Sequence, residues 1–388
     1  MGRKLHFCWF AGLSLVAAGQ ALATDPLDAW TVQTNGGSNI LQNVVYGNGL
    51  FVAVGSAGWV MTSSDGIQWT AQSSGTSNSL YTLAFGDGRF VAAGNRGTII
   101  VSEDGVNWTG IDSGTQNPLF GSTYGDGYHV VAGGSNVVVS SDGYVWTNRS
   151  SPVLTRAYLN AVVYGGGRFV GVGAGGYAVW STNTFDWLQS DSPVGNHFAI
   201  THVNGLFVAT GGGFVRFAEI GTSSNGMHWY SQSLATFASL VDVAYGNGRF
   251  VAVGLFLTFP PPAGPEYLFE SRDGLEWTAR TFPTPVAVYG LTYAQSHFYA
   301  VGSAETVLRS GSFAKACLQL AGPPGTNGLE LRISGEIGRP YRLQASPEAD
   351  GTNWQDLLLF TNPIDPDTVV TDPRANRFSR RFYRVVSP

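Results

Sequence analysis

The sequence repeats itself about every 39 residues, and this repeat limits the possible folds more than any other feature of the chain. A Gly-x-Gly turn marks each copy, at residues 47–49, 86–88, 125–127, 165–167 and 246–248. Asn204-Gly205 is a shortened copy, and residues 295–297 are a degenerate seventh. A repeating unit of this length buries its apolar face only by stacking on its neighbours, so the repeat predicts one continuous array.

A second motif, Ser-x-Asp-Gly-x-x-Trp, follows each turn. Its full copies contain four Asp-Trp pairs: Asp65 and Trp69, Asp104 and Trp108, Asp142 and Trp146, Asp273 and Trp277. Asn replaces Asp in the copies that end at Trp187 and Trp229. Ser and Asp side chains commonly hydrogen-bond the backbone of tight turns, so we interpret these residues as structural rather than as catalytic or metal-binding.

One repeat contains four short strands. An apolar, β-branched run precedes the Gly-x-Gly turn, whose residues accept the positive φ of a tight hairpin. A second run follows the turn, a third leads to the Asp-Gly turn, and Trp opens the fourth. Four antiparallel strands in about 40 residues are typical of a propeller blade. We expect each Trp ring to pack between adjacent blades.

The count predicts a seven-bladed β-propeller that is closed by its N-terminus. Six repeats have their own Trp, whereas the seventh, residues 288–312, has only three strands. The missing fourth strand is supplied by Trp30-Thr31-Val32-Gln33, which matches the Trp-Thr strand of the other blades. Such closure would remove the exposed sheet edges that invite aggregation.

The two ends of the chain differ from the repeat. Residues 1–23 combine Arg3 and Lys4, an apolar run and Ala21-Leu22-Ala23, which predicts a signal peptide and a secreted or periplasmic protein. The propeller is assigned to residues 24–312, a linker to 313–328 and a small β-sandwich to 329–388. The sandwich is expected from alternating apolar runs and the aromatic residues Trp354, Phe382 and Tyr383.

At the level of motifs, the Ser-x-Asp-Gly-x-x-Trp hairpins resemble a shortened Asp-box of sialidase-like propellers. The repeat over residues 27–312 is also similar to propellers of the photosystem II assembly and stability factor type. Residues 338–346, Trp354 and the run 380–384 resemble small C-terminal modules of secreted Verrucomicrobia-type proteins. These resemblances imply the fold strongly and the function weakly.

The sequence contains no recognisable catalytic set. A sialidase needs an arginine triad with a Tyr/Glu pair, and these residues cannot be assigned here. The histidines show neither HExxH nor Cys/His ligand spacing, so we predict neither a metal nor another cofactor. Residues 24–312 hold 18 acidic and 10 basic residues, which argues against a nucleic-acid partner.

Binding is therefore expected on the face opposite the recurring turns, which we call the loop face. It is built by the turns between second and third strands and by the connections between blades. The candidate residues on it are Arg96, Asp112, Arg149, Arg156, His197, Arg216, Phe256, Phe259, Tyr267, Arg280 and Glu305. Residues 255–267 form the most unusual of these loops, because they are apolar and rich in proline.

The leading hypothesis is a non-catalytic, monomeric binding scaffold for a protein or polysaccharide outside the cytoplasm. One alternative is a divergent sialidase-like glycoside hydrolase, and a further alternative is an assembly factor for an envelope complex. No apolar segment after residue 23 is long enough to form a membrane-spanning helix.

Overall fold

The protein is described by a computed structural model that divides into two compact units, Pro26–Gly311 and a second unit that includes Ser312–Pro388. The residues that the structure describes are 9–10, 13–14, 25–149, 151–191, 195–212, 217–234, 238–256, 268–280, 286–313, 317–320, 329–334, 340–347, 353–361, 367–375 and 381–386. The predicted signal peptide lies outside them except for β1 (Trp9–Phe10) and β2 (Leu13–Ser14).

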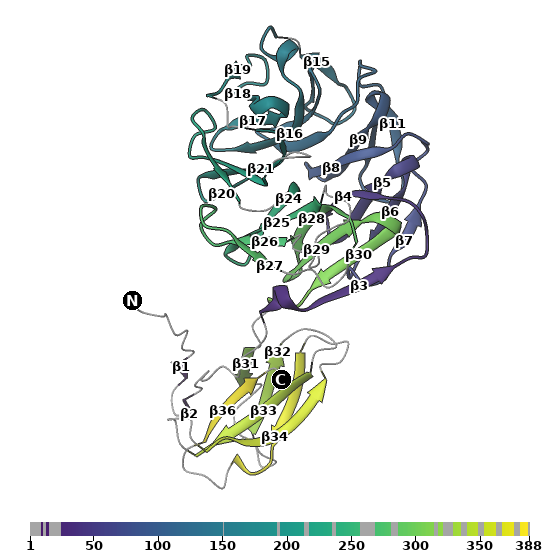
Figure 1. The fold of residues 1–388 in the computed structure, drawn as a ribbon. Coiled ribbons are helices and arrows are strands. Elements are labelled where there is room, and N and C mark those ends of the chain that lie inside the picture. The colour runs from purple at the N-terminus through teal and green to yellow at the C-terminus, as the bar shows by residue number, and fades with distance from the viewer. Residues whose placement is uncertain are drawn as a thin grey trace. The chain divides into compact units, whose positions relative to one another are not determined.

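The larger unit is a ring of seven four-stranded antiparallel sheets, each of them one blade (Figure 1). Blade 1 contains β4 (Leu41–Gly47), β5 (Leu50–Gly55), β6 (Val60–Ser63) and β7 (Thr70–Gln72). Blade 2 contains β8 (Leu80–Gly86), β9 (Arg89–Gly94), β10 (Ile99–Ser102) and β11 (Thr109–Ile111). Blade 3 contains β12 (Gly121–Gly125), β13 (Tyr128–Gly133), β14 (Asn136–Ser140) and β15 (Thr147–Arg149). Blade 4 contains β16 (Leu159–Gly165), β17 (Arg168–Gly173), β18 (Ala178–Ser181) and β19 (Leu188–Gln189).

The remaining blades follow the same order. Blade 5 contains β20 (His197–Val203), β21 (Leu206–Gly211), β22 (Glu219–Ser223) and β23 (Tyr230–Ser233). Blade 6 contains β24 (Ala238–Gly246), β25 (Arg249–Phe256), β26 (Leu268–Ser271) and β27 (Thr278–Arg280). Blade 7 contains β28 (Val288–Ala294), β29 (His297–Gly302), β30 (Thr306–Ser310) and β3 (Trp30–Thr34). The prediction of an all-β, seven-bladed propeller is confirmed.

Short 3-10 turns connect several of the strands. They are η1 (Pro26–Asp28), η2 (Ser56–Gly58), η3 (Asn95–Gly97), η4 (Leu154–Arg156), η5 (Ala174–Gly176) and η6 (Ser303–Glu305). Within the described residues, no helix is long and apolar enough to span a membrane.

The N-terminal strand closes the ring as predicted. Strand β3 pairs antiparallel with β30, in a register that sets Trp30 opposite Ser310 and Thr34 opposite Thr306. The Trp30 Nε1–H donates to the carbonyl of Leu27, three residues earlier, at 2.8 Å. The tryptophans of blades 2 to 6 make the same bond to the carbonyl three residues before them. Trp30 therefore takes the structural place of the Trp that the seventh repeat lacks.

The Asp-Gly turns are organised by the side chains of their Ser and Asp. In blade 1, Gly66 N–H donates to Ser63 Oγ at 2.8 Å, and Ser63 Oγ donates to Asp65 Oδ1 at 3.0 Å. The same Asp65 oxygen accepts the next two backbone N–H groups, at 2.8 and 2.9 Å. Asn183 and Asn225 use their amide oxygens in the same way. The repeated carboxylates are thus committed to their own turns.

The tryptophans of blades 1 to 6 pack where two blades meet. Trp108 of blade 2 packs on a cluster that includes Val52, Val54 and Val60 of blade 1. Trp277 of blade 6 likewise packs on a cluster with Val208 of blade 5. Ring burial at these interfaces removes large apolar areas from water and makes each blade depend on its neighbour.

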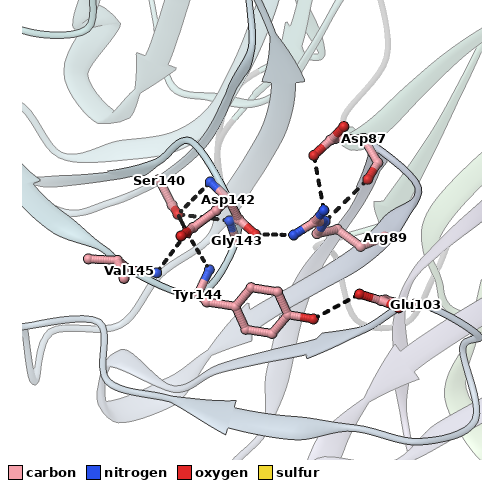
Figure 2. A network of polar contacts seen from close by, with 8 residues as sticks. All are labelled: Asp87, Arg89, Glu103, Ser140, Asp142, Gly143, Tyr144 and Val145. Atoms are coloured by element: carbon pink, nitrogen blue, oxygen red, sulfur yellow. Dashed lines mark hydrogen bonds and ion pairs between the residues drawn. The ribbon is translucent and has the colours of Figure 1, made fainter.

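The Asp-Gly turns also hold neighbouring blades together (Figure 2). Arg89 of blade 2 donates to the backbone carbonyl of Asp142 in blade 3 and to the Asp87 carboxylate at 3.0 Å. Tyr144 Oη donates to Glu103 across the same interface at 3.1 Å. The backbone N–H groups of Val145 and Tyr144 hold the pKa of the Asp142 carboxyl below its usual range. This face of blades 2 and 3 is therefore occupied by structural contacts.

The smaller unit contains two three-stranded antiparallel sheets. The first has β32 (Leu329–Ser334) between β31 (Cys317–Leu320) and β35 (Asp367–Asp372); the second has β33 (Pro340–Ser346) between β34 (Gln355–Thr361) and β36 (Phe382–Val386). The two sheets share a core of Leu329, Leu331, Leu343, Ala345 and Tyr383. The buried Tyr383 hydroxyl donates to the Asp372 carboxylate at 2.9 Å, which also pairs with Arg381.

Candidate functional site

The central channel of the ring contains a cavity of about 580 Å³. It is walled by the first strand of every blade, namely β4, β8, β12, β16, β20, β24 and β28. Figure 1 shows several of these innermost strands, including β4, β8, β16, β24 and β28, around the centre of the ring. The lining residues come from the first half of each strand, and that half lies toward the loop face because the strands run from there to the Gly-x-Gly turns. The cavity therefore occupies the loop-face half of the channel.

A β-bulge near the start of the innermost strands shapes this cavity. In blade 2, Leu80 pairs with Gly94 and Thr82 with Ala93, so Tyr81 between them has no partner on β9. The same register shift occurs in blades 1, 4, 5, 6 and 7. A bulged residue is free of the regular pleat and its side chain can be re-aimed, which explains why bulges are common beside binding sites.

The six bulge residues and Phe120, which holds the equivalent position in blade 3, all line the cavity. In blade order they are Gln42, Tyr81, Phe120, Asn160, Phe198, Val241 and Tyr289. Four of them are aromatic, and Tyr158 adds a fifth ring just before β16. The repeat thus places one variable side chain per blade around a common centre.

Three of the rings form a continuous arc over blades 2, 3 and 4. Tyr81 and Phe120 stack with ring centroids 5.4 Å apart, and Phe120 lies 6.2 Å from Tyr158 at an interplanar angle of 33°. Tyr158 is 53% exposed and Phe198, on blade 5, is 36% exposed. Large rings that remain accessible in a concave site offer apolar contact area to a ligand.

One carboxylate, Asp242 of blade 6, lines the cavity beside the rings. Its Oδ1 accepts the Val243 N–H at 2.8 Å, and its Oδ2 accepts the Leu291 N–H of blade 7 at 2.7 Å. Burial raises the pKa of Asp242 to about 7, although these two N–H groups act in the opposite direction. The Asp242 side chain is only partly exposed, and the exposed part faces the cavity rather than open solvent. The protein around it therefore desolvates the carboxyl group strongly.

The cavity wall also carries neutral polar groups. Amides and hydroxyls from Gln42, Asn43, Asn160 and Ser122 line it. Among the described lining residues there is no arginine and no second carboxylate, so this part of the channel holds neither an arginine triad nor a pair of acids. Nor do three or more His, Cys, Asp or Glu side chains come together as a metal site anywhere in the described residues.

The loop residues that the sequence analysis predicts as a binding site do not line the channel cavity, as far as the structure describes them. Arg96 and Asp112 are exposed and line a second cavity of about 360 Å³ on the outer part of blade 2, next to residues 74–76. Arg156 is exposed at the end of η4. Arg149 lies with its guanidinium carbon 3.8 Å from the centre of the Phe185 ring, so it contacts blade 4.

Two further candidates form polar contacts within the propeller. Arg280 forms ion pairs with Glu270 and, at 3.0 Å, with Asp28. Glu305 is 4% exposed and its carboxylate accepts the side-chain N–H of Asn39 at 2.7 Å.

His197 is completely buried at the first residue of β20, where neither ring nitrogen has a hydrogen-bond partner within the described chain. Burial lowers its pKa to about 4.

The last four candidates fall in or next to undescribed segments. Arg216, Phe259 and Tyr267 lie outside the described residues, as does most of the proline-rich loop. Phe256 ends β25, where its backbone pairs with Ala238.

Comparison with known proteins identifies the fold. No family model matches the chain, and no curated protein matches it. Among solved structures, YCF48 bound to D1 peptide covers 75% of this chain and 97% of its own, at 15% identity and a TM-score of 0.58. An inactive virginiamycin B lyase from Staphylococcus aureus with quinupristin covers 73% and 99%, at 10% identity and a TM-score of 0.62. The WD40 propeller of Doa1 covers 74% and 97%, at 14% identity and a TM-score of 0.54. The chain therefore shares the β-propeller fold with these proteins.

Proposed function

We propose that this protein is a non-catalytic scaffold that binds an extended segment of a protein partner in the channel cavity on the loop face. The observation that carries the proposal is the cavity itself, whose volume of about 580 Å³ falls within the range of about 300–1,000 Å³ usual for ligand sites. Its wall combines aromatic rings with a few amides and hydroxyls. Such a wall can bury apolar side chains and hydrogen-bond a peptide backbone.

The aromatic arc is well suited to peptide recognition. Tyr and Phe side chains have two rotatable bonds, so they lose little conformational entropy when a ligand immobilises them. Tyr81 and Phe120 already support each other by stacking, which reduces the loss further. A structurally similar propeller, YCF48, has a structure with a bound D1 peptide, which makes a peptide ligand a natural choice for this fold.

The test is selection of random, N-acetylated peptides on the immobilised protein, followed by affinity measurements on variants. We expect Tyr81→Ala and Phe198→Ala to weaken the selected peptides, because each substitution removes a ring from the cavity wall. Tyr230→Ala is the matched control, since Tyr230 is 79% exposed on the outer strand β23, away from the channel. Peptides that bind all three variants equally well, or a failure to select any peptide, would contradict the proposal.

A polysaccharide ligand is the second candidate, because aromatic rings also stack on sugar rings. A glycan array with the same variants separates the two ligands. Binding of a glycan, lost in Tyr81→Ala, together with no selectable peptide would favour the polysaccharide. Cleavage of a sialoside that depends on Asp242 would instead favour the hydrolase alternative.

We also propose that the protein acts outside the cytoplasm, on the basis of the basic, apolar and Ala-x-Ala pattern in residues 1–23. Sequencing of the mature N-terminus should find a chain that begins at Thr24. A role in assembling an envelope complex would be one use of such a scaffold, and capture of a single membrane-complex subunit through the channel would support it.

A further inference from the structure

Asp242 is a carboxyl group of the channel cavity that has no ion-pair partner in the part of the chain that the structure describes. Among the described residues, no arginine, lysine or histidine pairs with Asp242, and its two recorded hydrogen bonds come from backbone N–H groups. Each carboxylate oxygen can accept more than one hydrogen bond. Asp242 therefore retains capacity to accept a donor that enters the cavity.

The position is distinctive within the repeat. The residues equivalent to Asp242, which follow the bulge in the other blades, are Asn43, Thr82, Gly121, Ala161, Ala199 and Gly290. Thr82 uses its hydroxyl to bridge to Ser122 of the next blade at 2.8 Å, so a neutral side chain is sufficient for a blade-to-blade contact. The charge of Asp242 is thus not required by the ring, although its buried position is costly for an ion.

The blades on either side of Asp242 each contribute one aromatic residue to the cavity wall. Asp242 lies on blade 6, next to Val241, while the bulge residues of blades 5 and 7 are Phe198 and Tyr289. A cavity wall that offers a carboxylate and aromatic rings matches the chemistry of a cation, which gains from the charge and from the ring faces together. The advantage is larger in a cavity than at an open surface, because water screens the charges less.

We infer that the channel cavity selects peptides by a lysine or arginine side chain, which inserts between Phe198 and Tyr289 and pairs with Asp242. This inference rests on the proposed peptide-binding function and names the ligand's determining residue. The long aliphatic stem of either side chain would contact the rings, and its charged end would reach the carboxylate.

The first experiment uses the N-acetylated peptide selection described above, in which the peptide side chains supply the only cations. We expect the selected peptides to share a Lys or Arg. Replacing that residue with norleucine or citrulline should weaken binding at least about tenfold, since a desolvated ion pair with aromatic contacts is worth this much. Selected peptides that lack a basic residue, or that bind equally well with citrulline, would overturn the inference.

The second experiment changes the cavity. Asp242→Asn should weaken the basic peptide and leave its citrulline form unaffected. Because Asn can lose one of the two backbone hydrogen bonds and so disturb the ring, Val241→Lys and Val241→Gln provide an independent pair. Both keep Asp242 in place, but only lysine brings a cation into the cavity. We expect Val241→Lys to abolish binding of the basic peptide and Val241→Gln to retain it; equal binding by the two variants would refute the inference.

The outcomes distinguish this inference from the proposed function. Peptides that lack a basic residue but still require Tyr81 and Phe198 would leave the scaffold function in place and reject the role of Asp242. Peptides that bind independently of all the channel residues would reject both.

Discussion

His197 offers the sharpest physical test of the propeller core. It begins the innermost strand of blade 5, at a position that is leucine in blades 1, 2, 3, 4 and 6 (Leu41, Leu80, Leu119, Leu159 and Leu240). The imidazole is fully buried, and burial lowers its pKa from 6.5 to about 4. Between pH 6.5 and about pH 4, His197 is therefore protonated in the unfolded chain but neutral in the folded protein.

The sign and size of the effect follow from linkage. Above pH 6.5 the residue is neutral in both states, and its contribution to stability is fully present; it is lost as the pH falls from 6.5 toward 4. Between pH 8 and pH 5 the loss is about 2 kcal/mol for this one histidine. We expect His197→Leu to remove that loss, because leucine cannot titrate. His197→Gln is the matched control, since it keeps a buried polar group without the titration.

The measurement is urea unfolding at pH 8 and pH 5, followed by tryptophan fluorescence. Carboxylates such as Asp242 contribute equally to the wild type and to both variants, so the differences between the proteins isolate His197. The free energy of unfolding should fall by about 2 kcal/mol less in each variant than in the wild type. If both variants keep the full wild-type pH dependence, the imidazole is not buried in the way that the structure places it.

Three further predictions concern the turns, the closing strand and the cavity. Gly97→Ala should destabilise the protein by about 3 kcal/mol or more, because the new Cβ would lie 2.0 Å from the Thr115 carbonyl oxygen at a φ of +67°. Gly88→Ala, at a positive φ but in open space, should cost about 1 kcal/mol, and Gly110→Ala should cost almost nothing. Equal melting temperatures for the three variants would contradict this prediction. Deleting residues 26–34 should expose β30 and cause aggregation in size-exclusion chromatography, and Trp30→Ala should cost about 3–5 kcal/mol in urea unfolding; a monodisperse deletion variant that melts like the parent would disprove closure by β3. Because burial raises the pKa of Asp242 to about 7, binding of a basic peptide should weaken about tenfold in titration calorimetry between pH 8 and pH 6. The other ionisable side chains of the cavity wall belong to Tyr81, Tyr158 and Tyr289. An unchanged pH profile in Asp242→Asn would reject the assignment to Asp242.

The fold was readable from the sequence because the repeat encodes it several times. Residue types with narrow backbone requirements recur at fixed places, such as the Gly-x-Gly turns and the Asp that accepts three hydrogen bonds in its own hairpin. The closing strand was predictable for a different reason. The residues around Trp30 match the sequence of the fourth strands, and the seventh repeat has no fourth strand of its own.

The cavity was not predictable from the same patterns. Its wall is made by bulge residues such as Tyr81 and Phe198, and a bulge is a matter of register between two strands rather than of one residue type. The sequence favours loop residues as the binding site instead. Two of these residues, Arg280 and Glu305, form polar contacts with Asp28 and Asn39 of the N-terminal segment. The available signal was variability: the cavity residue of each innermost strand differs from blade to blade, whereas the buried residue before it is leucine in five of the seven blades.

The proposed function requires that ligands bind in the channel on the loop face. The most direct test is a selected peptide that contains one photo-crosslinking benzoylphenylalanine, with the crosslinked residues identified by mass spectrometry. We expect crosslinks on the innermost strands, at or beside Tyr81, Phe120, Tyr158, Phe198 and Tyr289. Crosslinks confined to the outer strands, or to the Asp-Gly turns around Asp142, would contradict it.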